Sequence, residues 1–263
     1  MRIWYQSFTD PEADRPYFSR LGGYLRTVSG PGCDVQLFGI QPGVAQAHPI
    51  SEFRCAAQVI VNALAAAEEG YDAFVIGHFQ EPGLAEARSA AGIPVLGLGE
   101  AAMLHACTLG RKIGLLATGP ALVPSLEDQV VRLGLERRVA AIRTLNPRAG
   151  QFNRAFDDEG AYRSLRDAFT AQAEAMLDLG VDVIIPAGGH PMLLFTREQS
   201  FAVGGAVVLD GLPVAVAAAE TAVRLGLLNG TAASRRAAYA RPSAEAVAQF
   251  RRAFPAGPLR SGE

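Results

Sequence analysis

The sequence contains few of the features that mark specialised protein classes. Its 263 residues include only three cysteines, Cys33, Cys55 and Cys107, and none of them belongs to a Cys-x-x-Cys pair. So low and odd a count does not build a disulfide framework and is typical of a reducing compartment, so we expect a cytoplasmic protein. The N-terminal residues lack a long apolar segment, so no signal peptide is expected. The longest apolar run, near 203–219, is interrupted by polar and turn residues and is not a membrane span.

An excess of charge and nucleotide-binding loops are also missing. The 24 basic and 26 acidic side chains are interspersed and give a net charge of −2. A chain without a basic stripe does not favour nucleic acid as a partner. No Gly-x-Gly-x-x-Gly or Walker-type glycine loop opens a helix, so neither a dinucleotide nor a P-loop nucleotide is expected.

What the sequence does contain is an alternation of short β-branched or aromatic runs with Ala-, Leu- and Arg-rich segments of helical period. This alternation is typical of βαβ units and a parallel sheet. We expect strands at Arg2–Gln6, Asp34–Ile40, Ala73–Gly77, Val95–Gly97, Lys112–Ala117, Val139–Thr144, Val183–Pro186 and Val214–Ala217. We expect helices at Pro16–Thr27, Ser51–Glu69, Glu100–Leu109, Val123–Leu133, Tyr162–Leu179, Glu220–Leu228 and Ser243–Phe254.

The two halves of the sequence resemble copies of one unit. Gly70–Gly77 has the same order of glycine, acidic turn and apolar strand as Gly180–Ala187. The Gly-x-Pro-Val motif at Gly92–Val95 recurs at Gly211–Val214, and a helix that begins with glutamate is expected after each. We therefore expect an α/β fold of two pseudo-symmetric lobes, each a short parallel sheet flanked by helices. The first lobe is expected at 1–105 and 215–263, and the second at 106–214.

The strand ends are where function is expected. Ligands of open parallel sheets bind beyond the carboxyl ends of the strands. Where two such sheets face each other, the cleft between them is the expected active site. The residues that directly follow each strand are therefore the candidates.

The stretch around the third expected strand carries a specific pattern. It reads Asp-Ala-Phe-Val-Ile-Gly-His-Phe-Gln-Glu-Pro-Gly-Leu over 72–84 and Ile-Pro-Val-Leu-Gly-Leu-Gly-Glu-Ala-Ala over 93–102. This pattern resembles the strand, cysteine, DPGL turn and IPVxGIGEAA junction of the aspartate/glutamate/hydantoin racemase superfamily, nearest its hydantoin racemase branch. The segment 109–119 resembles the strand that follows, with its Thr-containing loop. The resemblance extends from the start of the chain to about Gly230.

The resemblance implies a mechanism from which this sequence departs. In the family, two cysteines, one in each half, flank a carbon acid, and one removes a proton while the other delivers one on the opposite face. His78 stands in the place of the first cysteine and Gly188 in the place of the second. The chain's own three cysteines fall in expected helices or in an early loop. The two-thiol mechanism therefore cannot operate here.

Three residues are candidates for catalysis. An imidazole can replace a thiol as acid or base, because its unperturbed pKa lies closest to neutrality. We expect His78 to be catalytic, the alternative being a histidine whose nitrogens bond to loop backbone. His190 either lines the cleft, where it would serve the opposite face, or turns away. Glu81 either orients His78 or is a solvated carboxylate of the turn.

The expected substrate-binding residues also follow strands. The glycines at 188–189 would let backbone N–H groups approach an anion, and the family's backbone beside the second cysteine has that role. Ser7 and Thr118 resemble the family's positions for gripping carboxylate or amide groups, although such hydroxyls also cap loops. The full expected set is Gln6, Ser7, His48, Phe79, Thr118, Gly119, Gly188 and Gly189.

A metal site is the alternative use of the histidines. His48, His78 and His190 all fall on loops expected on the cleft side, and three imidazoles suffice for zinc or another divalent ion. The three are far apart in sequence and show no HxH or HExxH spacing. We therefore expect no cofactor, with a divalent metal as the alternative.

These observations lead to one main functional hypothesis and two alternatives. The main hypothesis is an enzyme that transfers a proton at carbon in a small carboxylate or cyclic amide, as an isomerase, racemase or decarboxylase, with His78 in place of a cysteine. The alternatives are a metal-dependent hydrolase or lyase and a non-catalytic protein that binds a small acid. The resemblance also implies a homo-oligomer.

Overall fold

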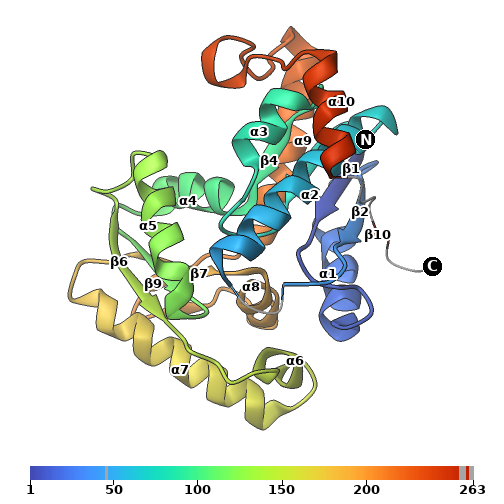
Figure 1. The fold of residues 1–263 in the computed structure, drawn as a ribbon. Coiled ribbons are helices and arrows are strands. Elements are labelled where there is room, and N and C mark those ends of the chain that lie inside the picture. The colour runs from blue at the N-terminus through green and yellow to red at the C-terminus, as the bar shows by residue number, and fades with distance from the viewer. Residues whose placement is uncertain (45–46, 255–258, 261–263) are drawn as a thin grey trace.

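Two five-stranded sheets with helices on their faces confirm the expected α/β architecture (Figure 1). The structure, a computed structural model, describes residues 1–44, 47–254 and 259–260. The strand order is β10-β2-β1-β3-β4 in the first sheet and β6-β5-β7-β9-β8 in the second. Parallel pairing joins β1 to β2 and β3, and β5 to β6 and β7, whereas β10 and β8 are antiparallel edge strands.

The elements follow one another as alternating strands and helices. The first half comprises β1 (Arg2–Gln6), α1 (Arg15–Val28), β2 (Asp34–Gly39), α2 (Pro49–Glu68), β3 (Ala73–Ile76), α3 (Leu84–Ala90), β4 (Val95–Gly97) and α4 (Leu98–Leu109). The second half comprises β5 (Ile113–Ala117), the 3-10 turn η1 (Pro120–Leu122), α5 (Val123–Arg132), β6 (Val139–Thr144), α6 (Gln151–Ala155), α7 (Glu159–Leu177), β7 (Val183–Ala187), α8 (Gly189–Phe195), β8 (Ala202–Val203), β9 (Ala206–Val208) and α9 (Gly211–Asn229). A C-terminal extension adds η2 (Ala237–Tyr239), α10 (Ala244–Ala253) and β10 (Leu259–Arg260), which pairs with β2 of the first sheet.

The duplication expected from the sequence is visible in the topology. The order β2-β1-β3-β4 in the first sheet corresponds to β6-β5-β7-β9 in the second. The acidic turn has the same task in both halves. Asp72 accepts a hydrogen bond from the backbone N–H of Arg2 at 2.7 Å, and Asp182 accepts one from that of Lys112 at 2.8 Å. Each aspartate thus ties the chain just before the third strand of its half to the start of the first strand.

The expectation of a strand at Val214–Ala217 is wrong. Those residues belong to α9, which begins at Gly211. The side chain of Asp210 caps this helix by accepting from the backbone N–H of Leu212 at 2.9 Å, and a proline in the first turn lacks only an N–H that needs no helical partner. The strand of the second half that corresponds to β4 is instead the short β9. Glu220 accordingly lies inside α9, and its carboxylate accepts from the backbone N–H of Gly30 at 2.8 Å.

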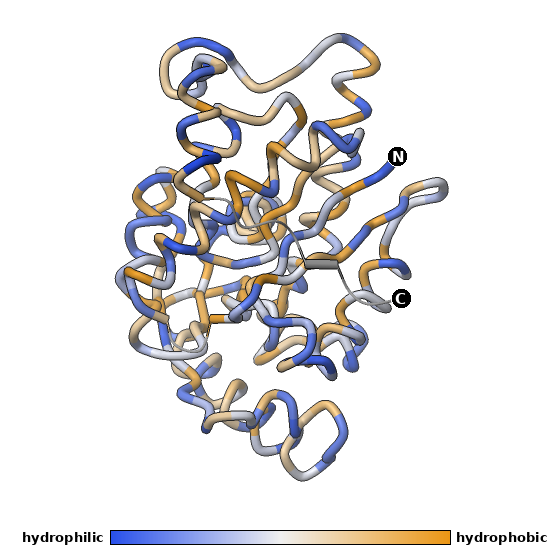
Figure 2. The backbone as a smooth tube through the Cα atoms, turned by 45° about the vertical axis from the view of Figure 1, so that its right-hand side comes forward, coloured by the Kyte–Doolittle hydropathy of each residue, from blue (hydrophilic) through white to orange (hydrophobic). Residues whose placement is uncertain are grey.

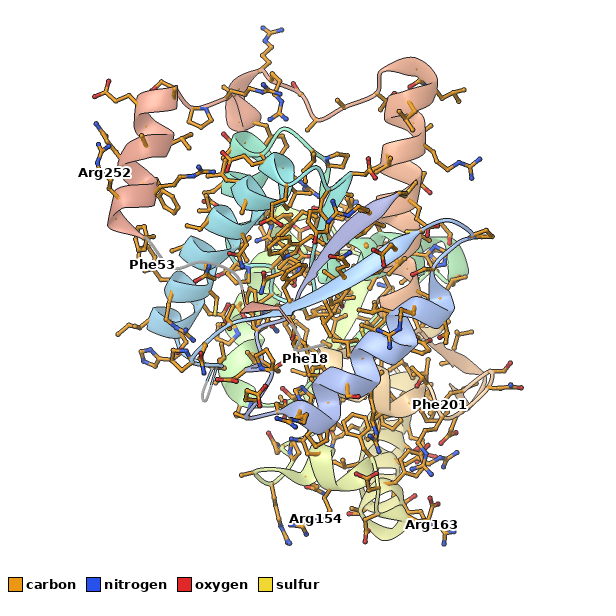
Figure 3. The ribbon with its side chains drawn as sticks, turned by 90° about the vertical axis from the view of Figure 1, so that its right-hand side faces the viewer. Phe18, Phe53, Arg154, Arg163, Phe201 and Arg252 are labelled. Carbon is orange, nitrogen blue, oxygen red and sulfur yellow. The ribbon has the colours of Figure 1, made fainter. Side chains whose placement is uncertain are left out.

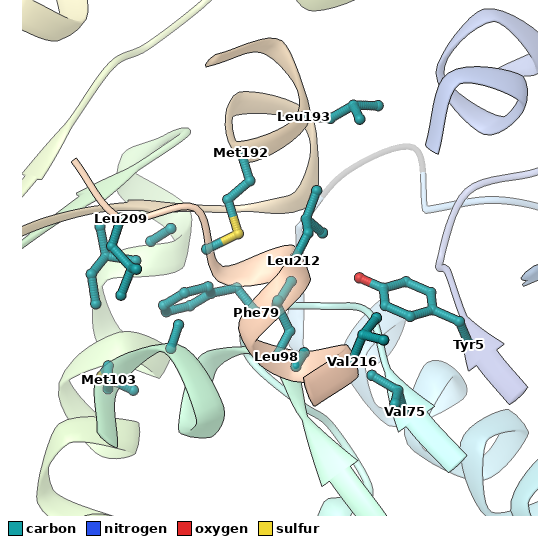
Figure 4. Packing of buried hydrophobic residues seen from close by; sticks show 14 of the residues in the cluster. Tyr5, Val75, Phe79, Leu98, Met103, Met192, Leu193, Leu209, Leu212 and Val216 are labelled. Carbon is teal, nitrogen blue, oxygen red and sulfur yellow. The ribbon is translucent and has the colours of Figure 1, made fainter. Parts of the chain in front are cut away.

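The last helix of each half covers the sheet of the other half. Helix α4 packs against β5 and β7, and α9 packs against β3 and β4, while the two helices also contact each other. Alternate residues of the strands, such as Tyr5 and Val75, face this shared core, together with Leu212 and Val216 of α9 (Figure 4). The two halves are therefore joined by one continuous hydrophobic core rather than by a thin interface.

The opposite face of each sheet has a core of its own. Trp4, Phe74 and Ile76 pack beneath α2 and α3, and Leu116 and Ile184 pack beneath α7. The hydrophobic segments run through the interior, whereas hydrophilic stretches gather on outer helices and turns (Figure 2). Long cationic side chains such as Arg154 and Arg163 extend from the periphery (Figure 3).

Helix α9 is long and apolar enough to cross a membrane if length and composition alone are considered. Its place between the sheets accounts for that composition, because Ala215, Val216 and Ala219 are fully buried against them. The lobe boundaries at 105/106 and 214/215 stay a prediction. The part of the C-terminal extension that the structure describes lies against the first half, where Arg251 pairs with Glu68 at 2.8 Å.

Candidate active site

Loops from both halves enclose one cavity of about 430 Å³. The first half contributes the loops after β1, β2 and β3, and the second those after β5, β6 and β7. The carboxyl ends of all these strands point toward it, as the strand-end rule for parallel sheets anticipates. The lining comprises Ser7–Thr9, Tyr17, Val44, Ala47, Gly77–Gln80, Thr118–Leu122, Pro147–Gly150, Phe152 and Ala187–Pro191.

His78 lies in the lining two residues after β3 ends. The residue between them, Gly77, packs so tightly that a Cβ there would lie 2.1 Å from Cε1 of Tyr5. Glycine is therefore required for the chain to turn at this point with Tyr5 buried beneath it. The imidazole of His78 stacks on Phe8, with 4.6 Å between ring centroids, and 19% of its side chain is exposed.

The surroundings of His78 keep its imidazole neutral. Its Nδ1 atom is buried and has no hydrogen-bond partner among the described residues. Burial lowers the pKa of His78 to about 4, because the charged form loses its hydration. The nearest carboxylate is that of Glu52 in the first turn of α2, with Oε1 4.0 Å from Nε2 of His78. Burial also raises the pKa of Glu52. At neutral pH His78 is therefore placed to accept a proton.

The corresponding point of the second half holds no acid or base. Gly188 follows β7 directly, and His190 comes two residues later in α8. His190 does line the cavity, so it does not turn away from it. Its Nε2 lies 2.9 Å from Oδ2 of Asp14, and its ring stacks on Tyr17 with 3.8 Å between centroids. The cavity thus has one imidazole from each half, each with a carboxylate beside it.

The expected substrate-binding residues fall into two groups. Ser7, Phe79, Thr118, Gly119, Gly188 and Gly189 line the cavity, whereas Gln6 and His48 do not. Gln6 is completely buried, and its Oε1 accepts from Nε1 of Trp4 at 3.0 Å and Nδ2 of Asn62 at 2.6 Å. Its amide therefore serves the core beneath the loop and has no free group for a ligand.

Glu81 does not face His78. Its side chain is buried, and it accepts from the backbone N–H of Glu100 at 2.5 Å and from Nε2 of Gln129 at 2.8 Å. The same Nε2 donates to the carbonyl oxygen of Phe79 at 2.8 Å. Burial raises the pKa of Glu81 to about 7. Its carboxylate therefore fastens the turn after His78 to α4 and α5, and the expectation that it orients the imidazole is not met.

The three histidines of the metal alternative do not converge. His48 is exposed at the start of α2, where its Nδ1 accepts from the backbone N–H of Ile50 at 3.3 Å. Within the residues that the structure describes, no group of three or more His, Cys, Asp or Glu side chains is placed to hold a metal ion. The arrangement thus gives the zinc alternative no support.

The cysteines lie outside the cavity, as the sequence indicates. Cys55 is buried in α2, and burial raises its pKa to about 12. The pKa of Cys33 is likewise raised to about 12 by burial and by the nearby carboxylate of Glu220. Both thiols therefore stay protonated at neutral pH.

Several site residues escape the strand-end rule. Tyr17 and Phe152 line the cavity from α1 and α6, and Arg148 lines it from the loop after β6. Glu52 and Asp14 stand behind the two histidines from the starts of α2 and α1. All except Arg148 lie in helices or, in the case of Asp14, directly before one, so no strand pattern could have indicated them.

Comparison with known proteins agrees with this architecture. The model of a family described as Asp/Glu/Hydantoin racemase matches residues 17–219. The chain belongs to this racemase family. It is 33% identical to a hydantoin racemase of Rhizobium meliloti over 181 residues, which cover 68% of this chain and 70% of the relative. It is 30% identical to a hydantoin racemase of Pseudomonas sp. (strain NS671) over 196 residues, covering 73% and 76%.

The solved structure of an allantoin racemase shares the fold over nearly the whole chain. The allantoin racemase of Pseudomonas fluorescens superposes with a TM-score of 0.76 and 24% identity, covering 92% of this chain and 97% of that one. The two facing sheets are thus the racemase fold, and the chain is a racemase-like enzyme by family.

Proposed function

We propose that this racemase-family enzyme transfers a proton at carbon in a small cyclic amide or carboxylate, with His78 as the base in place of a cysteine. The observation that carries this proposal is the position of a buried, neutral imidazole two residues after β3, in the lining of the cavity between the halves. A general base must be within reach of the proton it removes and must be unprotonated at the working pH. The place of His78 in the lining and its lowered pKa support this role.

The chemistry needs no cofactor. His78 accepts the proton from a carbon next to a carbonyl group, the C–H bond breaks, and its electron pair moves onto the carbonyl oxygen as an enolate. Hydrogen-bond donors around the cavity, among them the hydroxyl of Thr118 and the backbone beside Gly188, are suited to stabilise that oxygen. A proton delivered to the opposite face of the same carbon gives the other enantiomer. The buried imidazolium of His78 then releases the proton it took, because burial has removed its hydration.

His190 supplies the second face in this proposal. Racemisation needs one acid/base group on each side of the carbon, because each group removes the proton of one enantiomer and delivers the proton that forms the same enantiomer. His190 belongs to the opposite half of the pseudo-symmetric fold, so it is the candidate for the side opposite His78.

The lining favours a neutral cyclic amide over a dicarboxylate. Arg148, exposed at the cavity, is the one arginine or lysine in the described part of the lining, while Phe8, Phe79 and Phe152 supply aromatic walls. A ligand with two carboxylates would leave one of them without a cation. The relatives described as hydantoin racemases agree with a ring of this kind, and the aromatic walls suit an apolar substituent on it.

The test is hydrogen–deuterium exchange at carbon, followed by NMR in D₂O with each enantiomer of 5-benzylhydantoin, against an enzyme-free blank. We expect the wild type to exchange both enantiomers. His78→Asn should slow one of them by about 10²–10⁴-fold, and His190→Asn should slow the other. His105→Asn, a change on the exposed face of α4, is the matched control.

Two results would count against the proposal. If His78→Asn exchanges both enantiomers at the rates of the wild type, His78 is not the base. Ligand binding without exchange of any hydantoin or amino acid by the wild type would instead indicate the non-catalytic binding protein.

Assembly into a homo-oligomer in the cytoplasm belongs to the same proposal, and light scattering of the purified protein tests the assembly.

A further inference from the structure

One contact at the cavity joins the two halves through their functional side chains. Asp14 lies just before α1 in the first half, and His190 lies in α8 of the second. Nε2 of His190 and Oδ2 of Asp14 are 2.9 Å apart, and the two side chains are only 29% and 17% exposed. The contact is therefore short and partly shielded from water.

Asp14 is itself held in one orientation. Nδ2 of Asn153 in α6 donates to its Oδ1 at 2.7 Å, so both carboxylate oxygens have partners. Tyr17, one turn later in the same segment of chain, stacks on the face of His190. The imidazole is thus fixed at its edge by a carboxylate and on its face by a phenol ring.

This arrangement decides which nitrogen of His190 carries the hydrogen. A carboxylate accepts hydrogen bonds, so Nε2 must be the donor. In the neutral ring Nδ1 is then the acceptor, and it has no hydrogen-bond partner in the parts of the chain described. His190 thereby keeps one lone pair free for a proton.

We propose that Asp14 is a positioning residue that fixes His190 as the Nε2–H tautomer, leaving Nδ1 as the proton acceptor that replaces the missing group at Gly188. The inference rests on the proposed function and adds how the acid/base group on the second face of the substrate is held. His78 has no carboxylate hydrogen-bonded to its ring, because Oε1 of Glu52 lies 4.0 Å from its Nε2, beyond hydrogen-bond distance. The two faces therefore differ in how their bases are held, and only the His190 face depends on Asp14.

Asn153 makes a decisive substitution possible. Oδ1 of Asn153 is buried and has no hydrogen-bond partner, so the Asn153 amide can turn and accept as well as donate. Asp14→Asn alone can therefore present either its oxygen or its NH₂ group to His190. Asp14→Ala presents neither, so Nε2 loses its acceptor and the Nδ1–H tautomer becomes populated beside Nε2–H. In the double variant Asp14→Asn with Asn153→Asp, the carboxylate at 153 accepts from the NH₂ group, so the amide oxygen again faces Nε2. The double variant should restore the Nε2–H tautomer.

The experiment is nitrogen-15 NMR of histidine-labelled full-length protein, in which tautomers are distinguished directly and His190→Asn assigns the signal. Glu12→Gln, which removes an exposed carboxylate from the same turn, is the control. We expect Nε2–H alone in the wild type and control, a mixture with Nδ1–H in Asp14→Ala, and Nε2–H alone again in the double variant. Tautomer populations in Asp14→Ala equal to those of the wild type overturn the inference, and so does a double variant that keeps the mixture.

Exchange rates separate this inference from the proposed function. A catalytic group that loses its fixed position costs about 10²-fold in rate, so Asp14→Ala should slow the enantiomer served by His190 by about 10²-fold. It should leave the other enantiomer within about threefold. If no protein exchanges either enantiomer but the tautomers change as expected, the proposed function fails and the positioning stands. If the wild type exchanges both enantiomers and Asp14→Ala does so at the same rates, the positioning fails alone.

Discussion

The burial of His78 has a measurable consequence for stability, which the substitution His78→Asn isolates. In the unfolded chain an imidazole has a pKa of about 6.5, whereas burial lowers that of His78 to about 4 in the folded protein. The folded pKa lies below the unfolded one, so the unfolded state binds more protons between these values. Stability is therefore fully present above about pH 6.5 and is lost as the pH falls toward 4.

The size of the effect follows from the two pKa values. At pH 5 the unfolded imidazole is largely protonated and the folded one largely neutral, so His78 lowers the free energy of unfolding by about 2 kcal/mol relative to pH 7. Any folded pKa between about 3 and 5 gives nearly the same figure, because the unfolded state sets the limit. In His78→Asn this component is absent. The stability difference between wild type and variant should therefore shift by about 2 kcal/mol between the two pH values, or about 4–8 °C in Tm.

The assay is urea unfolding at pH 7 and pH 5, followed by the fluorescence of Trp4. This residue is the single tryptophan of the chain and is completely buried beneath α2, so its emission reports loss of the first-half core. His105→Asn again serves as the surface control. If the stability difference between wild type and His78→Asn is the same at both pH values, the imidazole is hydrated in the folded protein, and the reasoning about a neutral base is refuted.

Three further outcomes are expected. Gly77→Ala should cost at least about 1–3 kcal/mol in urea unfolding, because its Cβ would lie 2.1 Å from the ring of Tyr5. Gly119→Ala, whose Cβ has nothing within 4 Å, should cost far less, and equal losses would contradict the packing. The free energy of unfolding of Glu81→Gln relative to wild type should rise by about 2 kcal/mol between pH 5 and pH 8. The pKa of the Glu81 carboxyl is raised to about 7 in the folded protein, so the wild type loses stability as the pH rises from about 4.5. A pH-independent difference in urea unfolding would place that carboxyl in water. EDTA should leave deuterium exchange unchanged, whereas loss restored by zinc would revive a metal role.

The sequence predicts the fold well where local signals and tertiary packing agree. β1, β4 and β6 match their expected bounds, and the acidic turns at Asp72 and Asp182 fall where the repeat placed them. The error at 214–217 has a physical cause, because an apolar run between two sheets has the composition of a buried strand. The better signal there was the N-terminal pattern of Asp210 followed by a proline in the first turn.

The site was only half predictable for a related reason. The strand-end rule found His78, Gly188 and His190, because the carboxyl ends of parallel strands converge whatever their side chains are. It failed for Gln6, whose side chain is held by Trp4, two residues before it in β1, and by Asn62 in α2. The carboxylates beside the histidines come from helix starts, so only the packed structure reveals them.

The exchange of α4 and α9 gives the chain the topology of a fused dimer. If each half were a separate protein, its last helix would pack on a second, identical copy. Both copies would then place the same loop at the cavity. A symmetric pair cannot place a histidine on one side of a substrate and a glycine on the other. Covalent fusion removes that restriction, so each loop is free to change alone, and His78 opposite Gly188 is what such independent change produces. The exchanged helices thus keep the arrangement of the two halves symmetric, although the residues that the two halves place at the cavity differ.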